Sequence, residues 1–180
     1  MKYTLSVLVE NQPGVLSKVS GLFSRRGFNI DSLAVGVTED PEISRMTIVV
    51  NGDEYILEQV EKQLNKVIPV IKVKNLNETG DFISSELALI KVNCNQKERF
   101  EVMKIAELMF AKIVDVSVSS LTLQCADSPD RIETLITLVR PFGIKEIVRT
   151  GTIAVEKGAN ITAVNKNRSC LKHTGMADPA

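Results

Sequence analysis

The order of two hydrophobic periods is the feature of this sequence that most restricts its fold. A period of two is typical of strands, and a period near 3.6 is typical of amphipathic helices. Between residues 3 and 76 these periods predict strand, helix, strand, strand, helix, strand, and residues 85–155 repeat that order. This is the order of the split βαβ, or ferredoxin-like, unit. The sequence therefore predicts an α+β fold with two ferredoxin-like (βαββαβ) domains in tandem.

The individual elements follow from where each period begins and ends. Expected strands cover 3–10, 28–37, 45–51, 67–76, 85–94, 111–117, 121–126 and 144–155, and expected helices cover 14–25, 54–66, 96–110 and 131–140. A phase slip between Ile30 and Leu33 predicts a bulge, and Gly151 interrupts the last strand. Asp53 and the run Asp127-Ser128-Pro129-Asp130 are typical helix starts.

Domain boundaries follow from changes in composition. We expect a first domain at 1–76, a linker at 77–80 and a second domain at 81–158, because a polar, turn-rich run separates the two repeats. Residues 159–180 are polar and aperiodic, which predicts a disordered tail. Both helices of a unit should cover one face of its sheet, and the bare opposite face is a surface that proteins commonly hide against a partner.

Composition disfavours several classes of partner. The 22 Lys and Arg residues balance 22 Asp and Glu residues, so no net charge favours nucleic acid or an anionic membrane. RNA-binding modules of this element order need aromatic residues on their central strands, whereas Ser6–Leu8 and Thr47–Val49 contain none. No apolar run approaches the roughly 18 residues that span a bilayer. We therefore expect neither nucleic acid nor membrane as a partner.

Groups suited to catalysis are also missing from the structured part of the pattern. The only histidine, His173, lies in the predicted tail, and no cluster has the spacing of metal ligands. No phosphate-binding glycine motif occurs. Cys94 and Cys125 fall in predicted strands and are expected to be small buried residues, and with Cys170 they form no disulfide or metal pattern. The sequence thus predicts a protein without an active site of its own.

The start of the chain predicts where the protein resides. Met1–Leu5 leads directly into the first strand, without a signal-peptide core or a transit segment. We expect the protein to remain where it is made, in a bacterial cytosol or in the stroma of a plastid that encodes it.

The turn between the first strand and the first helix, Glu10–Leu16, can be interpreted in two ways. Pro13 suits the first turn of a helix, and Gly14 lets another group approach the backbone closely. The unpaired N–H groups of a helix start bind small anions, so a carboxylate can dock there. An ordinary helix start has the same residues, and the turn alone leaves both interpretations open.

A longer match extends this turn. The run Leu5–Ile30 resembles the opening of an ACT domain, and more narrowly that of the small, regulatory subunit of acetohydroxyacid (acetolactate) synthase. The segments Ile30–Gly36, Ser44–Val50 and Leu57–Lys66 are similar to the same family. In the second repeat, Glu86–Val92 and Glu146–Gly151 match that family's C-terminal domain more loosely.

The resemblance implies a partner enzyme. In this family a large catalytic subunit uses thiamine diphosphate, Mg²⁺ and FAD to condense two pyruvates to 2-acetolactate, so this chain is expected to hold no cofactor. The small subunit activates the large one and confers feedback inhibition by valine or another branched-chain amino acid. Its effector sites lie between ACT domains paired in a homodimer. The alternative is a free-standing ACT-type amino-acid sensor with a different client.

The resemblance also implies which residues bind the effector. The N–H groups of Gly14, Val15 and Leu16 would hold its carboxylate, Asn11 and Asn29 would supply acceptors for its ammonium group, and Val15, Leu16 and Ile30 would contact its aliphatic group. Asn29 and Ile30 would come from the second copy. Asn11 is equally readable as a plain helix cap. The matching turn of the second repeat, Asn93–Lys97, lacks Pro-Gly, so we expect no site there.

Overall fold

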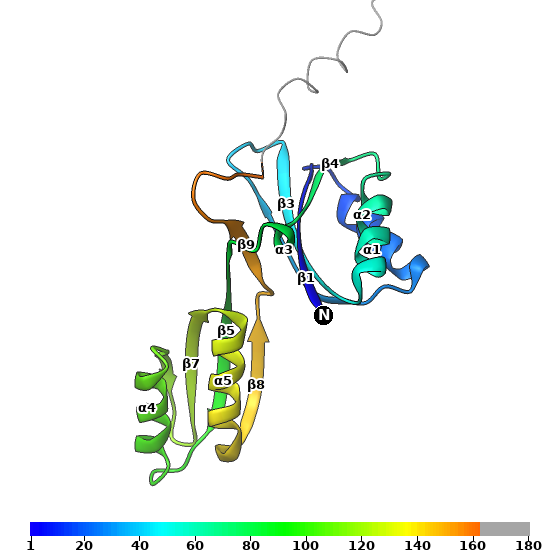
Figure 1. The fold of residues 1–180 in the computed structure, drawn as a ribbon. Helices are drawn as coiled ribbons and strands as arrows, with labels where there is room; N and C mark the ends of the chain where they lie inside the picture. The colour runs from blue at the N-terminus through cyan, green and yellow to red at the C-terminus, as the bar shows by residue number, and fades with distance from the viewer. Residues whose placement is uncertain (163–180) are drawn as a thin grey trace, which may run out of the picture.

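The predicted element order occurs twice along the chain (Figure 1). The computed structural model describes residues 1–162, apart from the side chain of Thr79. The first unit contains β1 (Lys2–Glu10), α1 (Val15–Arg26), β2 (Ile30–Val37), β3 (Ile43–Asn51), α2 (Glu54–Leu64) and β4 (Val70–Asn75). The second contains β5 (Phe82–Asn93), α4 (Arg99–Leu108), β6 (Lys112–Val116), β7 (Ser120–Asp127), α5 (Pro129–Val139), a 3₁₀ turn η1 (Arg140–Phe142), β8 (Ile144–Arg149) and β9 (Ile153–Glu156).

Both sheets have the same antiparallel topology. The strand order is β2-β3-β1-β4 in the first sheet and β6-β7-β5-β8 in the second, so the two central strands in each case are the first and third of the unit. In each unit the two long helices cover one face of the sheet. The predicted α+β fold with two ferredoxin-like units is therefore confirmed.

Each unit has its own core between sheet and helices. Alternate residues of the strands point toward the helices and pack against one face of each helix, as the hydrophobic periods predict. In the first unit Leu5, Val7 and Ile48 are fully buried against Val19 and Val60. In the second unit the buried cluster includes both predicted structural cysteines, Cys94 and Cys125.

Several local predictions hold at the level of individual residues. The register of β2 shifts between Ile30 and Ser32, which is the expected bulge. Asp53 caps α2 by accepting a hydrogen bond from the N–H of Ile56 at 2.8 Å. Pro69 precedes β4, an edge strand, as a residue without an N–H donor should. The break at Gly151 separates β8 from β9.

Other boundaries differ from the prediction. Helix α4 is shorter than 96–110, because residues 95–98 form a turn before it and Phe110 has a left-handed φ of 55° after it. At the expected linker, 77–80, α3 (Leu76–Thr79) forms a single helical turn that begins one residue earlier, where a strand was predicted to end, and the Asn75 side chain caps it at the N–H of Asn77. The domain boundaries themselves stay predictions.

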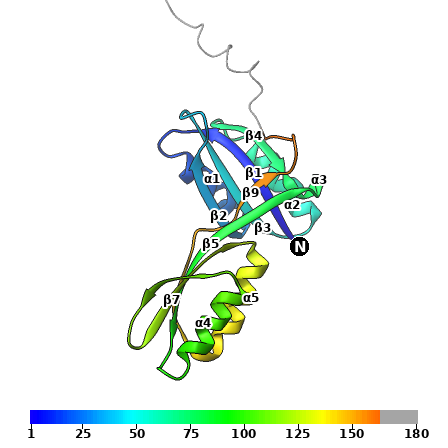
Figure 2. The same ribbon diagram turned by 90° about the vertical axis from the view of Figure 1, so that its left-hand side faces the viewer.

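The largest difference concerns the bare face of the first sheet. Strand β5 is twelve residues long, and its first four residues pair with β9 instead of the second sheet. We call residues 82–85 together with 153–156 the ribbon. Figures 1 and 2 show the ribbon crossing the face of the first sheet opposite α1 and α2, where β9 contacts β1. Because of this cover, Leu8 and Thr47 on that face are 2% and 3% exposed.

The ribbon is anchored on the first sheet by a buried ion pair. Glu156 of β9 has a side chain that is 1% exposed, and Lys74 of β4 donates to it at 2.6 Å. Thr162 also donates to Glu156, and its carbonyl accepts from Arg45 of β3. Of the stretch expected to form a disordered tail, residues 159–162 are thus described, and 163–180 lie outside the described residues.

Candidate functional site

The turn into α1 leaves the start of the helix accessible. Gly14 is the N-cap residue with a left-handed φ of 83°, and an added Cβ there would meet no atom within 4 Å. Gly14 has no side chain to cap the helix, and no acidic residue lies in its first turn. The N–H of Val15 makes a long contact with the Gln12 carbonyl at 3.4 Å, whereas the helix offers no acceptor to the N–H groups of Leu16 and Ser17. This end of α1 can therefore accept a small anion.

Asn11 fixes the shape of that turn. Its amide nitrogen donates to the Pro41 carbonyl at 2.8 Å, and its amide oxygen accepts from the Ser44 hydroxyl at 3.0 Å. Its backbone N–H donates to the Glu42 carbonyl at 2.7 Å. Asn11 thus ties the turn to the loop between β2 and β3, and it does not cap α1. One lone pair of its amide oxygen remains for another donor.

Two apolar residues of the predicted site have different surroundings. Val15 is 4% exposed and belongs to the core of the first unit, so its side chain supports the helix. Leu16 is 45% exposed and projects from the helix start. Only Leu16 of this pair presents its side chain at the surface.

Asn29 and Ile30 lie at the opposite end of the first sheet. The distance between this end and the Gly14 turn can be taken along β3, because Glu10 beside the turn pairs with Ile43 while Ile30 pairs with Val50. Those two partners are seven residues apart, or about 23 Å at the rise of an extended strand. Asn29 is exposed and donates to the Asp31 carboxylate at 3.3 Å. A single copy of the chain therefore does not bring all six predicted site residues together.

The matching turn of the second unit is closed by its own side chains. Asn95 accepts hydrogen bonds from the N–H groups of Lys97 and Glu98, at 2.9 and 3.0 Å. The Glu98 carboxylate in return accepts from the N–H of Asn95 at 3.0 Å. This is the reciprocal arrangement of a capping box, and it occupies backbone donors of the turn that leads into α4, whereas no side chain accepts from the start of α1.

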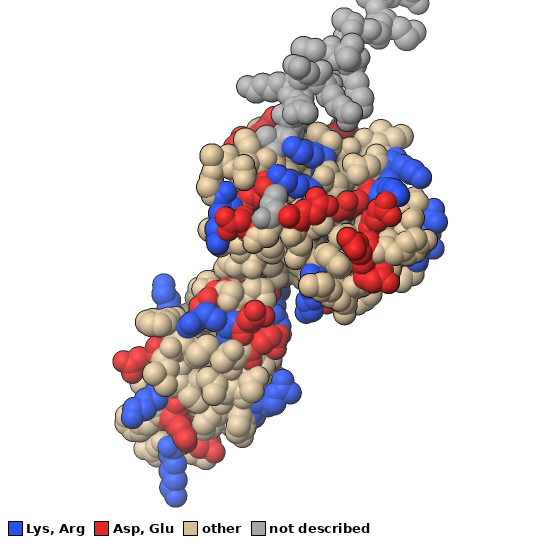
Figure 3. Space-filling view, in the orientation of Figure 1, with Lys and Arg blue, Asp and Glu red and all other residues tan. Residues whose placement is uncertain are grey.

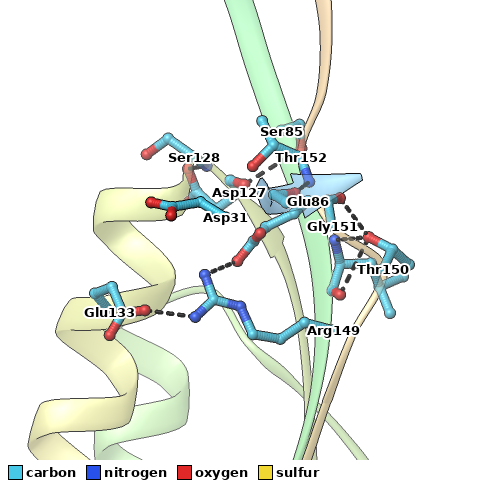
Figure 4. A network of polar contacts seen from close by, with 12 residues as sticks. Asp31, Ser85, Glu86, Asp127, Ser128, Glu133, Arg149, Thr150, Gly151 and Thr152 are labelled. Atoms are coloured by element: carbon cyan, nitrogen blue, oxygen red, sulfur yellow. Dashed lines mark hydrogen bonds and ion pairs between the residues drawn. The ribbon is translucent and has the colours of Figure 1, made fainter. Parts of the chain in front are cut away.

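A polar cleft of about 770 Å³ separates the start of β2 from the start of α5. Arg149 of β8 lines this cleft and binds Glu86 of β5 and Glu133 of α5 (Figure 4). Burial lowers the pKa of the Arg149 guanidinium, but its bonds to Glu133 and Glu86 outweigh burial and raise that pKa overall, so the group stays charged.

Sequence reasoning missed this ion-pair network. A signal for it exists in the strand pattern, because Glu86 falls in phase with the buried residues Ala88 and Ile90 of β5. A carboxylate at a buried strand position needs a cationic partner. The identity of that partner, 63 residues away, cannot be inferred from the strand itself.

Metal-binding clusters, membrane-spanning helices and basic faces are three further features that would indicate a function. Among residues 1–162, no group of three or more His, Cys, Asp and Glu side chains could hold a metal ion. None of the helices that the structure describes is long and apolar enough to cross a membrane. On the side of the molecule that Figure 3 shows, Lys and Arg side chains are interspersed with Asp and Glu over both units and form no basic face of the kind that binds nucleic acid.

Comparison with known proteins identifies both units. Residues 5–72 match the model of the AHAS small subunit-like ACT domain, and residues 85–158 match that of the small subunit of acetolactate synthase. The acetolactate synthase small subunit of Mycolicibacterium smegmatis is 51% identical over 156 residues, which are 87% of this chain and 91% of that protein. A probable acetolactate synthase small subunit of Archaeoglobus fulgidus is 49% identical over 88% of this chain and 98% of its own length.

A solved structure supports the same assignment. The crystal structure of the acetolactate synthase small subunit from Thermotoga maritima superposes with a TM-score of 0.81 at 37% identity, covering 88% of this chain and 98% of that one. Sequence and fold agree over both units. The chain belongs to the acetolactate synthase small subunit family.

Proposed function

We propose that this chain is the regulatory subunit of an acetolactate synthase, which activates the catalytic subunit and makes it sensitive to valine. The observation that carries the proposal is the accessible helix start at Gly14, together with the position of its complement, Asn29 and Ile30, at the far end of the sheet. Thiamine diphosphate, Mg²⁺ and FAD would belong to the catalytic subunit.

A homodimer through β2 would complete the site. Strand β2 lies at the edge of the first sheet, and among the described residues it pairs only with β3. In an antiparallel pairing of β2 with its own copy, the Ile30 end of one strand lies opposite the Val37 end of the other. The Val37 end leads into the loop that Asn11 holds. Asn29 and Ile30 of one copy would then approach Gly14 and Leu16 of the other.

The surface beside this edge favours burial against a second copy. Val35 and Val37 of β2 are 47% and 60% exposed. They border an apolar hollow of about 440 Å³ between β2 and the ribbon, where Ile153 and Val155 are also exposed. An edge strand with exposed valines is a surface that proteins normally cover.

Valine has three groups, and the composite site offers a partner for each. Its carboxylate suits the N–H groups at Gly14, Val15 and Leu16. Its ammonium group suits the amide oxygens of Asn11 and the partner copy's Asn29. Its isopropyl group suits Leu16 and the partner copy's Ile30. Because the ligand touches both copies, it would favour one arrangement of the dimer and so alter the catalytic subunit.

Gly14→Asp tests the site. A left-handed φ is tolerated better by Asp than by most residues, and the added side chain has open space. Its carboxylate would occupy the anion position at the helix start. We expect activation of the catalytic subunit to persist, while the valine concentration for half inhibition rises about tenfold or more. Gly158→Asp is the matched control, since Gly158 also has a left-handed φ and open space. Inhibition of the Gly14→Asp complex at wild-type valine concentrations would refute the site.

Reconstitution tests the partner. The chain is mixed with a thiamine-diphosphate-dependent large subunit, and acetolactate formation is measured with and without valine. We expect co-purification and stimulation. A chain that binds valine in calorimetry but neither co-purifies with nor stimulates the large subunit would instead be a free-standing sensor with a different client.

A further inference from the structure

The start of β2 contacts the second unit directly beside the proposed effector residues. The bulge between Ile30 and Ser32 inserts Asp31 as an extra residue, and a bulge changes the direction in which the next side chain points. The Ser32 hydroxyl accepts a hydrogen bond from the N–H of Thr152 at 2.8 Å. Ser32 lies two residues after Ile30, and Thr152 lies between β8 and β9.

The contact is too close to admit a side chain at Gly151. An added Cβ would lie 3.0 Å from the Ser32 hydroxyl and 3.1 Å from the Leu33 carbonyl oxygen. Gly151 also has a left-handed φ of 83°, which other residues adopt at a cost. The connector, residues 150–152, is thus pressed against the backbone of β2.

The connector joins two strands of the second unit that pair with different parts of β5. β8 before it pairs with β5 in the second sheet, whereas β9 after it forms the ribbon over the first sheet. The path of the chain between these strands therefore relates the second unit to the first.

The second unit holds its side of the connector firmly. The Thr150 N–H donates to the Leu87 carbonyl at 3.0 Å, and the Thr150 hydroxyl accepts from the N–H of Leu87 at 3.1 Å. One residue earlier, Arg149 binds both Glu86 and Glu133, which links the connector to α5 (Figure 4). A shift of the connector would be passed to α5 instead of being absorbed locally.

On the β2 side of the connector, a cleft leaves space in which the start of β2 can move. The cleft of about 770 Å³ is lined by Asn29, Ile30 and Asp31 on one wall and by the start of α5 on the other. Asn29 is bonded to Asp31 within the bulge. A ligand that forms a hydrogen bond with the Asn29 amide would therefore shift residues 29–32.

We propose that binding of the effector at Asn29 and Ile30 is transmitted to the second unit through the contact of Ser32 with Gly151 and Thr152. This inference rests on the proposed function, because it concerns the same site. It assigns Ser32 and Gly151 a coupling role, separate from holding the ligand.

Ser32→Ala in the reconstituted complex is the test. It removes the acceptor of Thr152 and leaves Asn29 and Ile30 in place. We expect valine binding in calorimetry to stay within about twofold, basal activation to be unchanged, and the fraction of activity that saturating valine removes to fall about fivefold. Gly151→Ala should have the same effect, more strongly. Ser84→Ala is the control, since Ser84 lines the same cleft and its hydroxyl has no hydrogen bond among the described residues.

Hydrogen exchange adds a readout that a merely structural role would not move. In the wild-type complex, valine should change the exchange of amides in residues 149–153, and in Ser32→Ala it should not. Wild-type inhibition of both Ser32→Ala and Gly151→Ala would overturn the coupling role while leaving the proposed function intact. Loss of valine binding itself in Ser32→Ala would also overturn it, by making Ser32 part of the binding site. Absence of valine binding in the wild type would refute both proposals.

Discussion

The strand-to-helix turns of the two units occupy the same place in the same topology, yet one is open and the other is closed. Gly14 begins α1 without a capping side chain and with free space above it. Asn95 and Glu98, in the turn before α4, satisfy each other's backbone donors. The difference teaches that a few hydrogen bonds at one turn decide whether a repeated fold leaves its backbone donors accessible there.

The outer faces of the two sheets differ in the opposite sense, because the first face is covered and the second is open. The ribbon covers the first sheet, where Lys74 and Glu156 form a buried pair. No helix or strand within residues 1–162 covers the matching face of the second sheet, where Lys91 and Glu146 are 3.8 Å apart with side chains 42% and 63% exposed. The second unit keeps both a closed turn and an open face, which suits contact with another protein better than binding of a small molecule.

Removing one lysine from each face should give the largest contrast in stability. Lys74→Met would leave the Glu156 carboxylate buried without its cation, at a cost of about 3 kcal/mol in the free energy of unfolding. Lys91→Met breaks an exposed pair and should cost less than about 1 kcal/mol. Urea unfolding of the full chain measures both. Adding Glu156→Leu to Lys74→Met should restore most of the loss, and equal losses for the two lysine variants would show that the ribbon does not bury its face.

The closed turn should be sensitive to its capping side chain. Asn95→Ala removes the acceptor for two backbone N–H groups and should lower stability by about 1 kcal/mol. Asn95→Asp keeps that acceptor and should be close to wild type. Urea unfolding compares the two variants, and valine inhibition should be unchanged in both. A change in valine response on Asn95→Ala would contradict the absence of an effector site in the second unit.

Glutamate substitutions on the second long helix of each unit, α2 and α5, should give the smallest difference in stability. Burial first, and then the charges of Glu78 and Glu58, raise the pKa of Glu61 on α2 above its ordinary 4.5. Its Oε1 atom is buried without a hydrogen-bond partner among the described residues. Glu133 on α5 instead binds Arg149. Glu61→Gln should therefore stabilise the protein slightly at pH 7, and Glu133→Gln should destabilise it slightly.

The raised pKa of Glu61 determines how its contribution to stability changes with pH. A raised pKa means that folding favours the protonated form, so its stabilising contribution is present below pH 4.5 and is lost as the pH rises through the folded pKa. Glu61→Gln should raise the melting temperature by about 1–3 °C at pH 7 and by nothing near pH 4. A gain that is equal at both pH values would assign the effect to packing and not to charge.

Much of the fold was predictable because its determinants are local. The period of the apolar residues indicated eight strands, and the structure has nine because the last predicted strand is divided at Gly151 into β8 and β9. The bulge after Ile30 was also indicated. Of the candidate site, the accessible helix start at Gly14 also followed from residue types adjacent in the sequence. The role of Asn11 did not, because its partners Pro41 and Ser44 are thirty or more residues away.

The sequence by itself thus determined the elements, their order and the contrast between the turns at Gly14 and Asn95, since these depend on neighbouring residues and backbone preferences. Only the tertiary structure decided that the second unit covers the first sheet through the ribbon, that Glu86 pairs with Arg149, and that Ser32 meets Gly151. These contacts join residues distant along the chain. Their partners are chosen by how two sheets pack, which no local period encodes.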